Sequence, residues 1–86
     1  MTPKQKKLKL ESIIALIIAA GFTQDSYGNY KRNLADHSYR IKLKKINIRI
    51  ERKSILGGEW YKITSQPISK IEIENLVKFM SKFFKA

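Results

Sequence analysis

The sequence predicts an α+β fold in which a helix, an antiparallel β-meander of three to five strands and a second helix follow one another, with both helices on one face of the sheet. Three observations carry this prediction: apolar residues at helical spacing near each end of the chain, an alternating stretch in the middle, and a length of 86 residues. A chain of this length has room for one hydrophobic core, so residues 1–86 are expected to form a single domain.

The first helix is predicted to begin at Thr2 and Pro3, because a hydroxyl can cap the first turn and proline suits the first helical position. Gly21 is the residue type that commonly ends a helix. The second half of the helix is apolar nearly all round, so we expect the sheet to cover one side and the other helix or a second subunit to cover another. This apolar run is too short to span a membrane, and we interpret it as a buried helix and not as a signal peptide. The predicted stripe is Leu10, Ile13, Ile14, Ile17 and Ile18.

The segment after this helix reads as short strands with turns between them. Residues 22–32, "FTQDSYGNYKR", predict a short strand, a turn from Ser26 to Asn29 and a second strand from Tyr30. We expect "NLADHS", residues 33–38, to be a connection. A later loop built on "SILGG" precedes a strand predicted over residues 59–64, "EWYKIT".

Residues 38–53, "SYRIKLKKINIRIERK", alternate between apolar and cationic side chains, which is typical of strands with one buried face. A strand cannot change the parity of its apolar positions without exposing half of them, so the chain bulges or turns near Lys44 and Lys45. A two-residue loop would place Arg40 opposite Arg49, whereas a four-residue turn keeps the same faces with less backbone strain. In the register that the two-residue loop produces (the tight register), Glu51 lies on the same face of the sheet as Arg40 and Arg49. The apolar positions are Tyr39, Ile41 and Leu43, then Ile46, Ile48 and Ile50.

The last helix is predicted to open with a capping box, because Ser69 and Glu72 have the S-x-x-E spacing, and Ile68 and Ile73 stand where a hydrophobic staple would form. An apolar stripe then follows at helical spacing. Its members are Ile73, Leu76, Val77, Met80 and Phe84.

The chain carries a net charge of +11, from 18 Lys and Arg against 7 Asp and Glu, with a pI near 10.1. Such a balance attracts polyanions, which include nucleic acid, an anionic membrane or an acidic protein. An A+T-rich genome offers the other explanation, since its codons favour lysine and isoleucine. The candidate nucleic-acid contacts lie on the polar face of the predicted sheet, where Trp60 would serve as a stacking platform unless it is part of the core. They are Lys31, Arg32, Arg40, Lys42, Lys44, Arg49, Trp60 and Lys62.

Residue types that carry catalysis or metal binding are scarce. The sequence has no cysteine, a single histidine, His37, and acids without ligand spacing, so we expect no metal, no cofactor and no enzymatic activity. Gly57 and Gly58 lack the lysine and the spacing of a phosphate-binding loop. The absence of cysteine fits a reducing compartment, and we expect a cytoplasmic protein without an integral membrane segment.

The predicted α-β-β-β-α order and the basic surface are similar in pattern to two known families, whose motifs two segments of the chain match only in part. "SQPISKIE" places Ser69 and Lys70 where the G-x-G-x-S-K-K-like run of one family opens its last helix, although acids follow here. "ADHS" places His37 near the start of a strand, as in a second family, although the Gly-Ser step of that family is missing. Together with the helix–strands–helix order, the chain resembles the double-stranded-RNA-binding fold and the HicA-type toxin ribonucleases that share it. The resemblance implies RNA binding and, as a minor alternative, a ribonuclease in which His37 is catalytic.

The leading hypothesis is a small non-enzymatic protein that binds DNA or RNA through phosphate contacts on a cationic sheet face. The alternative is a protein-interaction module, either an adaptor or a phage-type inhibitor that docks on an acidic or nucleic-acid-handling host protein. An exposed apolar patch around Leu16, Phe79 and Phe83 would mark that alternative, and a homodimer could also use it.

Overall fold

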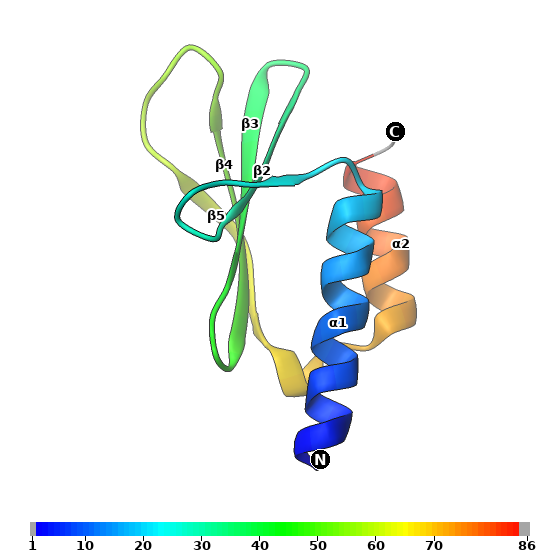
Figure 1. The fold of residues 1–86 in the computed structure, drawn as a ribbon. Helices are drawn as coiled ribbons and strands as arrows, with labels where there is room; N and C mark the ends of the chain where they lie inside the picture. The colour runs from blue at the N-terminus through cyan, green and yellow to red at the C-terminus, as the bar shows by residue number, and fades with distance from the viewer. Residues whose placement is uncertain (1, 85–86) are drawn as a thin grey trace.

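The structure is a computed structural model, and it describes residues 2–84. Five strands form one antiparallel sheet in sequence order, and both helices lie on the same face of it (Figure 1). The predicted helix–meander–helix arrangement is therefore confirmed. The elements are α1 (Pro3–Ala19), β1 (Thr23–Gln24), β2 (Tyr30–Leu34), β3 (His37–Leu43), β4 (Asn47–Ser54), β5 (Tyr61–Pro67), a 3₁₀ turn η1 (Ile68–Lys70) and α2 (Ile73–Phe83).

Helix α1 begins as its sequence predicts. The Thr2 hydroxyl accepts a hydrogen bond from the backbone N–H of Gln5, and the Gln5 side chain accepts one from the backbone of Thr2. Gly21 follows the helix with φ of +90°, a conformation that side chains with a Cβ rarely adopt. Ile13 and Ile17 are fully buried, but Ile18 is exposed, so the predicted stripe is narrower than expected.

The β3–β4 hairpin follows the wider of the two predicted registers. Ile41 lies opposite Ile50, and the backbone N–H of Lys44 donates to the Asn47 carbonyl at 2.8 Å across the turn. In this register Arg40 lies opposite Glu51, so the like-charge pair of the tight register does not form.

The predicted connection over residues 33–38 is wrong, because most of it belongs to strands. Leu34 lies opposite His37, which leaves only Ala35 and Asp36 in the loop, and Ala35 has φ of 54°. Asn33 and Ser38 are polar residue types that are typical of loops, and here they lie opposite each other on the outer face of the two strands. The Ser38 hydroxyl donates a hydrogen bond to the Asn33 side chain at 2.7 Å.

The predicted start of the last helix is also wrong. Residues Ile68–Lys70 form a 3₁₀ turn and α2 begins at Ile73, with no side-chain cap at Glu72. The intervening Ile71 has an extended backbone and a buried side chain, and the Ile68 side chain is buried as well. Burial of these two side chains therefore outweighs the capping pattern. On α2, Leu76, Met80 and the following Phe84 are buried, whereas Val77 of the predicted stripe is exposed.

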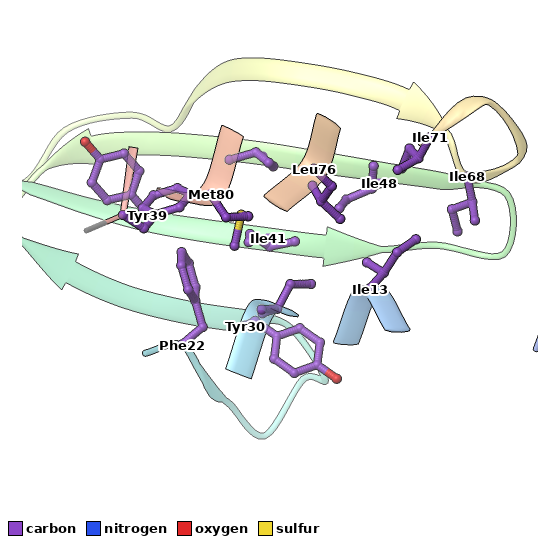
Figure 2. Close-up of a cluster of buried hydrophobic side chains, with 13 residues drawn as sticks. Ile13, Phe22, Tyr30, Tyr39, Ile41, Ile48, Ile68, Ile71, Leu76 and Met80 are labelled. Atoms are coloured by element: carbon purple, nitrogen blue, oxygen red, sulfur yellow. The ribbon is translucent and has the colours of Figure 1, made fainter. Parts of the chain in front are cut away.

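The hydrophobic core fills the space between the sheet and the helix pair (Figure 2). At one end it becomes aromatic, where the Phe84 ring makes edge-to-face contacts with Phe22 and Tyr39, both with ring centroids 4.9 Å apart. Because the helices take up one face of the sheet, the opposite face is left to polar and charged side chains. We call these the inner face and the outer face.

Candidate nucleic-acid interface

The outer face is set by the register of the three strands β3, β4 and β5. Arg40 lies opposite Glu51, and Glu51 in turn lies opposite Lys62 of β5, so these side chains share one side of the sheet. Lys42 and Arg49 lie opposite each other on the same side. At the register shift beside Ile50 and Glu51, Thr64 lies opposite the inner Ile50 and Lys62 lies opposite Glu51, so a bulge at Ile63 reverses the alternation of β5.

Glu51 is at the centre of a compact ionic cluster. Arg40 contacts its Oε1 through Nε at 2.9 Å and through Nη2 at 2.7 Å, while Arg49 donates from Nε to Oε2 at 2.9 Å. The Lys42 ammonium lies 3.9 Å from Oε1. Three cations therefore surround one carboxylate, and the cluster keeps an excess of positive charge.

Burial and charge act on Glu51 in opposite directions. Its side chain is 5% exposed, and this burial by itself would raise the pKa of the carboxyl. The hydrogen bonds and charges of Arg40, Lys42 and Arg49 outweigh burial, so the pKa of Glu51 lies below its ordinary value of 4.5. The carboxylate is ionised at neutral pH and is hidden beneath its cationic partners.

Trp60 belongs to the outer face and not to the core. The guanidinium of Arg40 lies over its ring at 4.1 Å from the centroid, and the Lys53 ammonium lies at 4.9 Å. Both are cation–π contacts. The Arg40 side chain is only 17% exposed, because Glu51 and Trp60 both cover it. Arg40 therefore organises this face, and its guanidinium is largely occupied.

The other predicted cations are more accessible. The side chains of Lys42 and Arg49 are 32% and 41% exposed, and Lys62 is exposed opposite Glu51. Lys44 is exposed at the β3–β4 turn. Lys31 lies opposite Arg40 but forms an ion pair with Asp25 at 3.1 Å. Desolvation by itself would raise the pKa of the Asp25 carboxyl. The Lys31 ammonium and two backbone N–H donors outweigh this effect and hold the pKa below its ordinary value.

Arg32 was predicted to contact nucleic acid on the outer face, but it lies on the inner face of the sheet. It lies opposite the buried Tyr39 on the inner face, and its Nη1 donates to the carbonyls of Ala20 and Phe84, the latter at 3.2 Å. These are the terminal carbonyls of α1 and α2, which carry partial negative charge. A Cβ on Gly21 would lie 3.3 Å from the guanidinium, so this glycine also makes room for it. Arg32 therefore joins the two helix ends and is not part of the outer face.

Lys53 is not among the contacts predicted from the sequence, although the alternation of its strand indicates that it lies on the outer face. It continues the odd-numbered outer positions of β4 after Arg49 and Glu51, and it contacts Trp60. The alternation of the strand alone would have identified it.

His37 lies at the start of β3 and is partly buried, with its ring centroid 6.3 Å from that of Tyr39. Ser38 points to the outer face and donates to Asn33, so the neighbouring residues of the "DHS" segment do not converge on one site. Within residues 2–84 the structure contains no cluster of His, Cys, Asp or Glu that could hold a metal ion, and no helix there is long and apolar enough to cross a membrane.

The predicted apolar marker of a protein-interaction module is partly buried. Leu16, Phe79 and Phe83 pack against the core, and the last two rings stack with centroids 4.6 Å apart. Among residues 2–84, the large aliphatic side chains that are exposed on the helix layer are instead Leu8, Ile18 and Val77.

Comparisons with protein-family models, with curated proteins and with solved structures give no match for this chain. The resemblance to the double-stranded-RNA-binding fold therefore rests on the order of elements alone, and the sheet here has five strands.

Proposed function

We propose that this protein binds nucleic acid through phosphate contacts made by the outer face of its sheet, without catalysing a reaction. One observation carries the proposal: the central carboxylate of that face, Glu51, is buried beneath cations, so the surface that meets solvent is cationic. Phosphate contacts supply most of the affinity of sequence-independent nucleic-acid binding. The contacting residues are Lys42, Lys44, Arg49, Lys53 and Lys62.

The arrangement favours phosphate contacts over base stacking. Single-strand binders stack successive bases on exposed aromatic rings. Here Trp60 lies just before the edge strand β5, and its ring is already in contact with Arg40 and Lys53. We therefore expect little dependence on base sequence, and tighter binding to duplexes than to single strands because the charge density of a duplex is higher.

The test is binding of labelled single- and double-stranded DNA and RNA at two salt concentrations. If five cations each neutralise one phosphate, affinity should fall several-hundred-fold between about 50 and 200 mM salt. The variant Lys42→Gln/Lys53→Gln/Lys62→Gln should bind far more weakly and show a salt slope that is less steep by roughly three phosphate contacts.

A matched control separates the outer face from net charge. Lys4→Gln/Lys7→Gln/Lys78→Gln removes the same charge from exposed positions on the two helices. We expect it to retain nearly all of the affinity. Equal losses in the two triple variants would show that only net charge matters, and an absence of binding by the wild type at low salt would disprove the proposal.

The second candidate function is a protein-interaction module, and the exposed aliphatic side chains of the helix layer favour it. Leu8, Ile18 and Val77 are exposed on that layer, away from the cationic face. A second copy of the chain or an acidic protein are the partners to consider. Sedimentation of the wild type and of Ile18→Ser/Val77→Ser would show whether the helix layer forms a homodimer.

A further inference from the structure

We infer that the outer face contains a defined seat for one phosphate group between Arg49 and Lys42, and that Glu51 is the positioning residue that holds this seat in shape. The inference rests on the proposed function and deepens it, because it names the ligand as a phosphodiester and the atoms that would bind it.

The first argument is the unused hydrogen-bonding capacity of Arg49. Its Nε is bonded to Glu51, and among residues 2–84 no side chain other than Glu51 pairs with the Arg49 guanidinium. A guanidinium that is fixed through Nε presents its two terminal Nη nitrogens as a fork, which matches two oxygens of a phosphate. Arg49 is also the most exposed arginine of the cluster.

The second argument is the like-charge pair formed by Lys42 and Arg49. The two residues are direct partners across β3 and β4, an arrangement that destabilises a sheet when nothing offsets it. Glu51 offsets it only in part, because Arg40 holds Oε1 at 2.7 Å while the Lys42 ammonium is 3.9 Å away. An anion placed between the Lys42 ammonium and the Arg49 fork would relieve the remaining repulsion.

The third argument concerns the rigidity of the seat. Glu51 is almost fully buried, and its two oxygens bind two different arginines, so it fixes the position of both guanidinium groups. Arg40 is further held by Trp60. A preorganised cation loses less side-chain entropy on binding than a free lysine does.

The test uses the variant Glu51→Gln, for which the two explanations predict opposite changes in nucleic-acid affinity. Glu51→Gln removes a negative charge from the face, so if charge alone matters, the variant should bind nucleic acid more tightly. If Glu51 positions Arg49, the variant should bind about tenfold more weakly, which corresponds to losing the alignment of one charge-assisted hydrogen-bond pair. Glu59→Gln is the matched control, since it removes an exposed acid at the β4–β5 loop.

Because Glu51→Gln could disturb the fold, a second pair of variants keeps the net charge constant. Arg49→Lys preserves the charge and loses the fork, whereas Arg52→Lys makes the same change at an exposed position of β4 outside the cluster. We expect weaker binding, by at least about fivefold, for Arg49→Lys alone. Thermal unfolding of each variant confirms that it is folded at the assay temperature.

The outcomes separate the two proposals. Weaker binding of Glu51→Gln and Arg49→Lys, with both controls near the wild type, supports the phosphate seat. Tighter binding of Glu51→Gln together with an unchanged Arg49→Lys overturns the seat and leaves the proposed function in place. If the wild type binds no nucleic acid at low salt, both are overturned.

Discussion

The two faces of the sheet use arginine in opposite ways. On the inner face Arg32 donates to backbone carbonyls at the ends of α1 and α2, and so joins elements that are distant in the sequence. On the outer face Arg40 and Arg49 converge on the single carboxylate of Glu51. The comparison shows that a cationic residue type in a strand does not by itself predict a binding role. What decides the role is which groups the fold brings to the guanidinium.

The largest expected effect is on the inner face and concerns packing. Ile41 is fully buried in the central strand β3, so Ile41→Ala should lower the free energy of unfolding by about 2–5 kcal/mol through lost burial and a cavity. Urea unfolding measures it. Leu56→Ala is the control, because Leu56 is 96% exposed and its truncation should change stability by less than about 0.5 kcal/mol. Similar losses at the two positions would contradict the assigned core.

The next effect tests the arginine of the inner face. Arg32→Gln should lower the free energy of unfolding by roughly 1.5–3 kcal/mol, because hydrogen bonds from a charged donor to the carbonyls of Ala20 and Phe84 are lost. Nucleic-acid affinity should change little beyond the effect of one unit of charge. Arg52→Gln, at an exposed position, supplies the matched charge change. A large and specific loss of binding in Arg32→Gln would return this residue to the interface.

The Glu51 cluster should show itself in the pH dependence of stability. Because the pKa of Glu51 is lowered in the folded protein, its ionic contacts contribute fully above the ordinary value of 4.5 and are lost as the pH falls through the lower folded value. Glu51→Gln should therefore cost about 1–3 kcal/mol at neutral pH and less in acid. Urea unfolding between neutral and acidic pH checks this. A cost that does not change with pH would mean that the contacts do not depend on ionisation.

The sequence predicts the face of the sheet on which a side chain lies better than it predicts which groups that side chain contacts. Alternation through residues 39–50 is enough to place Ile41 and Ile50 inside and Arg40 and Arg49 outside, because one buried face fixes the parity of a strand. The position of Arg32 could not be read in this way. Its strand is short and polar, and its partners are helix ends brought near by tertiary packing. The late start of α2 has the same origin, since burial of Ile71 overrides a local capping pattern.

The smallest predicted effect is the one that separates stability from binding most clearly. Lys42→Thr replaces one member of the like-charge pair with Arg49 by a β-branched residue that suits a strand, so it should stabilise the fold by a few tenths of a kcal/mol. The same change removes a wall of the proposed phosphate seat and should weaken nucleic-acid binding. Urea unfolding and binding at low salt measure the two effects on one variant. A residue that costs stability and contributes affinity is expected at a binding surface, whereas a lysine retained only by codon usage should contribute no affinity. If Lys42→Thr lowers stability and leaves binding unchanged, Lys42 is a structural partner of Glu51 and the outer face is a solvated surface.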